Sequence, residues 1–274
     1  MSSLSARSRL AFPAAAGGLG AAVTLGAYAR WIRPRVFSWG ATGDEAARPM
    51  AGDELCPRPQ LNATRAVTIA AGPEDIWPWL LQWGWNRAGF YSYDLLDNLG
   101  RPSARQILPQ FQRLAVGDWV PMGGRETPYT AYRVARLEPG TLMLWHKPGG
   151  TWLWLLEPDG GGGTRLITRL RSRYGWARPT IVAELILMEI GDPFMMRKCL
   201  LGIKQRAERL AAERDARRQD GPRAERGRPQ APATAREPGG AAGRRHVTVR
   251  DPRRPSRTGP RITVTRTIKG RFRA

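Results

Sequence analysis

A small group of polar side chains could act on a bound molecule. Tyr91, Tyr93 and Asp94 place two hydroxyls and a carboxylate close together, and His146 is one of only two histidines. Histidine can serve as an acid or base near neutral pH, whereas a few polar groups at the mouth of a pocket orient an apolar ligand. The alternative is structural. Asp94 would then cap the following helix, and His146 would face solvent because Trp145 takes the other face of its strand.

The other reactive residue types lack the spacing that chemistry needs. Cys56 and Cys199 are far apart in the sequence and belong to no metal-ligand pattern, so we expect two unrelated thiols. The glycine run 160–163 lacks the Lys-Ser/Thr of a phosphate-binding loop and is typical of a turn. Paired carboxylates and a nucleophile elbow are not found in the sequence. We therefore assign no catalytic residue, metal or cofactor, and we expect binding in place of catalysis.

Segment 64–69 begins the part of the chain that must position these polar groups. Val67 and Ile69 are expected on one face, with Arg65 and Thr68 on the other. This alternation of apolar and polar residues is typical of a half-buried strand. The segment therefore predicts a strand with one face toward the core.

A short helix and a dense group of aromatic residues follow this strand. Pro73 and the two acidic residues after it, Glu74 and Asp75, indicate the start of the helix. So many rings are more than a small core needs, and they are typical of the wall of a ligand cavity. The candidates for lining such a cavity are Trp83, Phe90, Tyr91, Tyr93, Asp94, Trp145, His146, Trp152, Trp154 and Met195. Core packing is the alternative for Trp152 and Trp154.

Short strands make up the middle of the chain. Residues 114–122 hold a Gly-Asp turn before a short strand, and the other expected strands cover residues 129–137, 141–146, 151–157 and 164–173. Turns that contain glycine or proline separate them, including the hairpin loop PDGGGG. Successive strands at this spacing predict an antiparallel meander.

Two helices close the globular part of the chain. Residues 180–189 are apolar nearly all round, so this helix should be buried or lie against a membrane. Asp192 and Pro193 indicate the N-cap and first position of a long helix that reaches about Arg214. Proline, glycine and arginine prevail beyond it, and the tail 216–274 is expected to be disordered.

The formal net charge of +21 is concentrated in this tail. As a flexible polycation, the tail would associate with anionic lipid or nucleic acid, and salt would weaken the association. If the chain is anchored with the tail on the cytoplasmic side, the membrane surface is the nearer polyanion. Low-complexity sequence without a partner is the remaining alternative.

The N-terminal stretch predicts a membrane anchor. Residues 10–29 carry no charge, and about 20 such residues are needed to cross a bilayer as a helix. Arg7 and Arg9 precede the run, while Arg30 and Trp31 follow it as interfacial anchors would. We expect a single-pass anchor with the globular domain in the cytoplasm. A cleaved signal peptide and a loose N-terminus are the two alternatives.

The order of strand, short helices, meander and long helix resembles the helix-grip fold of the START-related SRPBCC superfamily, which includes polyketide cyclases. The residues that carry the resemblance are TRAVTIAAGPEDIWPWLLQWG, GFYSYDLLDNLG, LAVGDWVPM, RLEPG and MMRKCLLGIKQRAE, which look like an actinobacterial-type branch. The resemblance implies an α+β fold in which a curved antiparallel sheet wraps around the long C-terminal helix and leaves a hydrophobic cavity between them. It does not settle activity, because members include carriers, sensors and a few enzymes.

These expectations divide the chain into four parts and give it one function. The parts are an N-terminal segment 1–33 with a hydrophobic helix, a linker 34–61 that packs along the domain, a helix-grip domain 62–215, and the tail 216–274. The expected function is that of a monomeric, membrane-tethered binding protein for a hydrophobic small molecule or lipid. The alternatives are a cyclase or dehydratase that uses the polar groups described above, and a scaffold or nucleic-acid-associated protein that acts through its tail.

Overall fold

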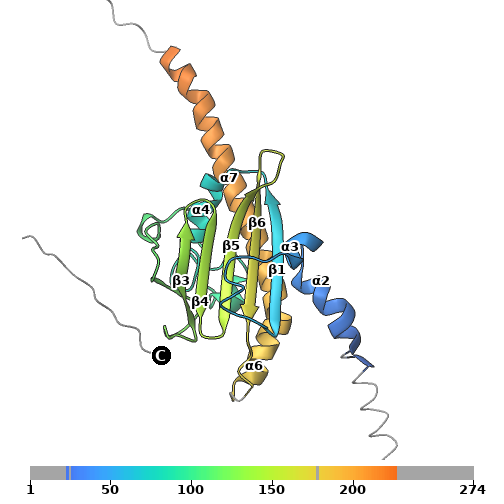
Figure 1. The fold of residues 1–274 in the computed structure, drawn as a ribbon. Coiled ribbons are helices and arrows are strands. Elements are labelled where there is room, and N and C mark those ends of the chain that lie inside the picture. The colour runs from blue at the N-terminus through green and yellow to red at the C-terminus, as the bar shows by residue number, and fades with distance from the viewer. Residues whose placement is uncertain (1–22, 25, 177–178, 227–274) are drawn as a thin grey trace, which may run out of the picture. The chain divides into compact units, whose positions relative to one another are not determined.

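A six-stranded antiparallel sheet and one long helix form the body of the protein (Figure 1). The computed structural model describes residues 23–24, 26–176 and 179–226. The strands are β1 Leu61–Ile69, β2 Trp119–Pro121, β3 Ala131–Glu138, β4 Leu142–Lys147, β5 Gly150–Pro158 and β6 Thr164–Ser172, in the spatial order β1-β6-β5-β4-β3-β2. The helices are η1 Tyr28–Ile32, α2 Arg33–Phe37, α3 Gly43–Ala47, α4 Pro73–Leu81, α5 Asp94–Asp97, η2 Pro109–Phe111, α6 Ile181–Ile186, η3 Leu187–Gly191 and α7 Asp192–Arg226. The expected α+β class and helix-grip architecture are confirmed.

Both faces of the sheet are covered. On the inner face, residues such as Met143, Trp154 and Leu166 pack in one large core with the buried side of α7. On the outer face, Leu144 and Ile167 pack in a smaller core with Met50, from the segment that precedes β1. A sheet covered on both sides has few exposed positions, which explains why β1 and β5 are buried along most of their lengths.

The expected facing of Arg65 was wrong. Arg65 lies on the inner face with Val67 and Ile69, because residues two apart in a strand share a face. Its side chain is 1% exposed and pairs with Asp192. The strand is therefore buried along most of its length, and Arg65 lies in the core rather than in solvent.

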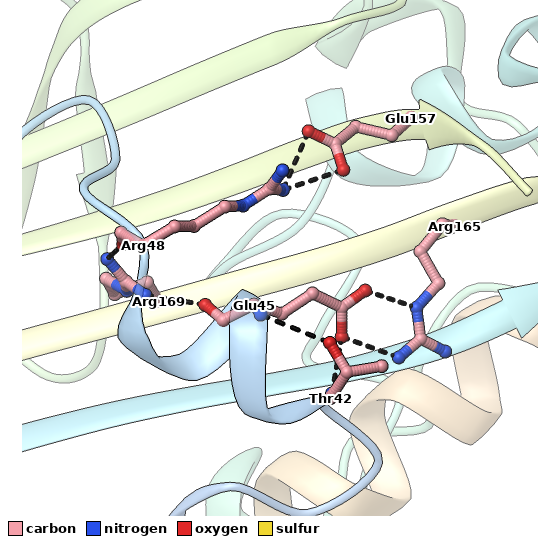
Figure 2. Close-up of polar contacts among 6 residues, drawn as sticks. All are labelled: Thr42, Glu45, Arg48, Glu157, Arg165 and Arg169. Carbon is pink, nitrogen blue, oxygen red and sulfur yellow. Dashed lines mark hydrogen bonds and ion pairs between the residues drawn. The ribbon is translucent and has the colours of Figure 1, made fainter.

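Ion pairs and hydrogen bonds hold the segment before β1 on the outer face of the sheet (Figure 2). Thr42 and Glu45 form a capping box at the start of α3. The Glu45 carboxylate also pairs with Arg165 of β6 at 2.8 Å, and Arg48 pairs with Glu157 of β5 at 2.7 Å. The buried Arg169 donates hydrogen bonds to backbone carbonyl oxygens of this segment, including that of Glu45. The linker expected to pack along the domain thus completes the outer layer of the fold.

Helix α7 differs from the expectation at both ends. The chain is helical from α6 through η3 into α7, so Asp192 lies within the helix and does not cap a new one. The wider π-type turn η3 precedes Pro193 and accommodates a residue that has no N–H to donate. At the other end, α7 continues 12 residues beyond Arg214, to Arg226. The half-buried i,i+4 pair of Lys204 and Glu208 supports the middle of the helix, where both side chains also bond to the backbone at the end of β1.

The structure leaves the N-terminal anchor and most of the tail untested. Within 23–24, 26–176 and 179–226, no helix is both long and apolar enough to cross a bilayer. Most of the uncharged run 10–29 lies outside the described residues, as does the tail from residue 227 onward. The membrane anchor and the disordered tail therefore stay predictions.

Candidate functional site

A cluster of aromatic side chains occupies the space between the sheet and α7. We call Trp83, Phe90, Tyr132, Trp145, Trp152 and Trp154 the aromatic cluster. Trp83 lies at its centre, with its ring centroid 5.4 Å from that of Trp145, 5.2 Å from Trp152 and 5.7 Å from Trp154. The strands supply the other indoles because positions 145, 152 and 154 all point to the inner face of β4 and β5.

The rings of the cluster pack directly on one another. Trp83 and Phe90 meet edge to face with centroids 4.7 Å apart, and Trp152 stacks on Trp154 at 5.5 Å. These are ordinary distances for contacting aromatic pairs, and they leave no room for another ring between the partners. The sequence predicted an open cavity here, whereas these side chains fill the space themselves in this structure.

Several indole N–H groups in this core have no acceptor. Trp83 donates to the backbone oxygen of Phe90 and to Cys199 Sγ, both at 3.3 Å, and Trp152 donates to Thr168 Oγ1 at 2.8 Å. By contrast, the buried indole nitrogens of Trp79, Trp145 and Trp154 have no hydrogen-bond partner among the described residues. An unpaired buried donor costs about 1–3 kcal/mol, so a core selected for stability alone would avoid these three groups.

The titratable groups near the cluster are held neutral. Burial raises the pKa of the Cys199 thiol to about 12, although the hydrogen bond from Trp83 opposes the shift. Burial also raises the pKa of Tyr132 above its ordinary value. Both groups therefore keep their protons at physiological pH, and the cluster is uncharged.

The structure brings together only part of the predicted cavity lining. Trp83, Phe90, Trp145, Trp152 and Trp154 meet in the cluster. Tyr91 is buried beside it, and its hydroxyl donates to the Trp79 carbonyl oxygen at 3.1 Å. Burial raises the pKa of Tyr91.

Four of the predicted residues do not meet at the cluster. Tyr93 is 44% exposed, and Lys198 lies over its ring. Asp94 accepts hydrogen bonds from the Ser103 amide and hydroxyl, so it fixes a loop and does not cap a helix as the structural alternative proposed. Met195 is half-buried, at the edge of the core.

His146 points away from the cluster. It is half-buried on the outer face, since its neighbour Trp145 takes the inner face, as the structural alternative predicted. His146, Tyr91 and Asp94 therefore do not converge on one reacting atom. Nor do the described ranges contain a group of three or more His, Cys, Asp or Glu side chains placed to hold a metal.

Sequence reasoning missed two members of the site, Tyr132 and Cys199. Tyr132 and Val134 share the inner face of β3, and the aromatic neighbours of Tyr132 come from other strands. Cys199 lies on the buried side of α7 and meets the Trp83 indole. Only the strand pairing and the position of the helix bring these residues together.

Two hollows open at the surface away from the cluster. One, of about 350 Å³, lies between the loop after α4 and the edge strand β2. It is lined by Trp85, Asn86, Arg87, Phe111, Trp119, Pro121, Gly124 and Glu126. The other, of about 450 Å³, is a charged groove between α4 and α7, with Asp75 and Arg214 on its walls. Neither hollow includes a residue of the aromatic cluster.

Comparison with known proteins gives likeness in structure only. No family model and no curated protein matches the chain. Among solved structures, it is similar to MLL2253 from Mesorhizobium loti, with 15% identity, a TM-score of 0.33, and coverage of 54% of this chain and 98% of that one. It is also similar to a Thermobifida fusca protein, with 16% identity, a TM-score of 0.34, and coverage of 54% and 94%. A third is the Polyketide_cyc-like protein Cgl2372 from Corynebacterium glutamicum, with 14% identity, a TM-score of 0.26, and coverage of 58% and 94%. At these identities and TM-scores the likeness assigns neither a family nor a function to this chain.

Proposed function

We propose that this chain is a membrane-attached helix-grip protein that binds a hydrophobic small molecule or lipid between its sheet and α7. The observation that carries the proposal is the set of unpaired indole donors at Trp79, Trp145 and Trp154 inside an otherwise apolar core. A ligand with an apolar body and one or two acceptor atoms would satisfy these donors while keeping the rings out of water.

Binding would require Trp83 to move, because its ring fills the centre of the cluster. Trp83 follows α4 in a short loop closed by mutual backbone hydrogen bonds between Gly84 and Gly89. Both glycines have positive φ, at 127° and 82°, a backbone conformation that other residues rarely adopt. The Trp83 indole shares its one N–H between the Phe90 carbonyl oxygen and Cys199 Sγ, both at 3.3 Å. The proposed ligand would replace these contacts and the ring contacts of Trp83 with its own.

Binding is favoured over catalysis by the positions of the polar candidates. The Tyr91 hydroxyl pairs with a backbone carbonyl, Asp94 is engaged by Ser103, and His146 lies on the other face of the sheet. General acid–base chemistry needs such groups within hydrogen-bond reach of one substrate. The proposed role is therefore to hold or transfer a molecule without changing it.

The test is native mass spectrometry of the full chain purified in mild detergent. We expect an adduct of a hydrophobic molecule on the wild type, and loss of that adduct in Trp145→Phe and Trp154→Phe, which keep a ring but remove the unpaired donor. Trp152→Phe is the matched control, because its N–H already has Thr168 as acceptor, and it should retain the adduct. An adduct-free wild type, or equal adducts in all three variants, would remove the proposal.

A further inference from the structure

One helical face of the protein is apolar and exposed. Along α6, η3 and the start of α7, the outward side chains are Val182, Ile186, Leu187, Ile190 and Phe194, between 49% and 67% exposed. Their spacing is that of one helical stripe. The opposite side of the same segment packs on the core through Ile181, Leu185 and Met188. The sequence predicted that this helix is buried or lies against a membrane, and the structure shows that half of it is not buried within the chain.

The N-terminal helical segment contacts η3 and carries exposed apolar residues of its own. Trp31 and Ile32 are more than half exposed, and so is Trp176, which precedes α6. Glu189 joins the two segments, since its carboxylate accepts hydrogen bonds from Arg33 at 2.8 and 2.9 Å and from Tyr28 at 3.2 Å. Figure 1 shows α2 and α6 at the same end of the sheet. We call Trp31, Ile32, Trp176 and the five residues of the stripe the apolar face.

We infer that the apolar face lies on the surface of a bilayer that contains anionic lipid, so that the folded domain docks on the membrane beside its anchor. This inference rests on the membrane attachment proposed above. Continuity of the chain supports it, because the uncharged run 10–29 leads directly into Arg30, Trp31 and Ile32. An exposed apolar patch of this kind marks an interaction site.

Charge favours an anionic surface over other occupants. Arg30, Arg35, Arg173 and Arg197 are exposed and belong to the same segments of the chain as the face. In contrast, the carboxylates of the described residues in 23–40 and 173–198 are half-buried or buried, and Glu189 has Arg33 as its partner. Tryptophan next to arginine, with apolar residues between, is typical of segments that lie in the membrane interface. A bilayer in this position would also lie against the end of the sheet where α7 begins.

Position-specific labelling of the full chain tests the inference. Both native cysteines are buried, so an engineered exposed cysteine can be labelled alone with the environment-sensitive fluorophore NBD. Ile190→Cys places the label on the apolar face. Gly161→Cys is the control, at the exposed β5–β6 hairpin and the opposite end of the sheet, where an added Cβ meets only ordinary contacts. The vesicles are phosphatidylcholine with phosphatidylglycerol, with and without bromine-labelled acyl chains as quencher.

We expect NBD at position 190 to be blue-shifted and quenched by the brominated lipid, and NBD at position 161 to be neither. Adding Ile186→Asp and Leu187→Asp to the labelled Ile190→Cys chain should abolish the quenching. If the chain floats with vesicles but the two labels behave alike, the docking face is wrong and the attachment stands. If the chain does not float, the proposed attachment itself fails. A blue shift at position 190 without vesicles, together with a doubled mass in solution, would assign the face to a second copy and overturn the inference.

Discussion

Arg65 Nη2 lies 2.7 Å from Asp192 Oδ2, and the two side chains are only 1% and 8% exposed. This ion pair joins the inner face of β1 to the first residue of α7. The ring of Phe37 covers the guanidinium at 5.4 Å and closes the site to solvent. Burial raises the pKa of the Asp192 carboxyl, and the Arg65 charge opposes that shift. The pair therefore fixes where the long helix crosses the sheet, at a high cost in desolvation.

Breaking this pair should destabilise the fold strongly. We expect Arg65→Met to lower the free energy of unfolding by about 3–5 kcal/mol, because Asp192 is left buried without its partner. The double variant with Asp192→Leu should recover much of the loss, since no uncompensated charge remains. Urea unfolding followed by tryptophan fluorescence measures both. Arg136→Met, which breaks an exposed pair with Glu138, is the control and should change stability by less than about 1 kcal/mol.

Acid should detach the segment that precedes β1 from the outer face before it unfolds the sheet, because the Glu45–Arg165 ion pair helps to hold this segment. A hydrogen bond from Arg165 lowers the pKa of Glu45, against the opposing effect of burial. The pair therefore contributes stability above the ordinary pKa of a glutamate, about 4.3, and loses it as pH falls through the lower folded-state value. The protection factors of residues 42–48 against hydrogen exchange, which account for the pH dependence of the intrinsic rate, should fall in that range while those of β5 stay high. Glu45→Gln should show the lower protection of residues 42–48 already at pH 7, and identical protection in the variant and the wild type would contradict this role.

The two cysteines should be unreactive in the folded chain. Burial raises the pKa of Cys199 to about 12 and also raises that of Cys56, and the thiolate is the reactive form. We expect a thiol reagent such as DTNB to label neither at pH 8 and to label both in guanidinium chloride. Rapid labelling of native protein would show that the Trp83 contact with Cys199 opens readily.

The sequence predicted the elements of the fold well, because they depend on local patterns. Alternation identified the long strands, and the apolar helix 180–189 and the later α7 follow from helical spacing. The face of the sheet on which a side chain lies, and its contacts with distant parts of the chain, were harder to predict. Arg65 was expected in solvent because arginine seldom enters a core, and only the position of Asp192, 127 residues later, explains its burial. The length of α7 was underestimated because residues 215–226 have no apolar stripe and include Gly221 and Pro222, which usually mark the end of a helix.

For the candidate site, too, the residue types could be predicted from the sequence, whereas their long-range contacts could not. The sequence identified most of the rings, since tryptophan is rare and its density was visible. It could not predict whether those rings line space or fill it, because this depends on distances between strands that are far apart in the chain. For helix 180–189 the sequence left two alternatives, burial or contact with a membrane. The exposure of Ile186 and Ile190 shows that this face is not buried among the described residues, and membrane contact stays a proposal.

A pair of glycine substitutions tests how closely α7 approaches the loop after α4. At Gly202 an added Cβ would meet the carbonyl oxygen of Tyr91 directly, and Tyr91 itself has a positive φ of 57°, so the loop has little freedom to yield. We expect Gly202→Ala to cost about 1–3 kcal/mol of unfolding free energy through overpacking. At Gly191 the nearest atom is the flexible end of Leu187 at 3.4 Å, and Gly191→Ala should stabilise the helix by up to about 1 kcal/mol. Urea unfolding tests for the close approach, because helix propensity alone predicts that both substitutions stabilise the protein, whereas overpacking predicts that Gly202→Ala destabilises it. A stabilising Gly202→Ala would place α7 farther from Tyr91 and leave Trp83, whose indole reaches Cys199 on the same stretch of helix, less firmly held.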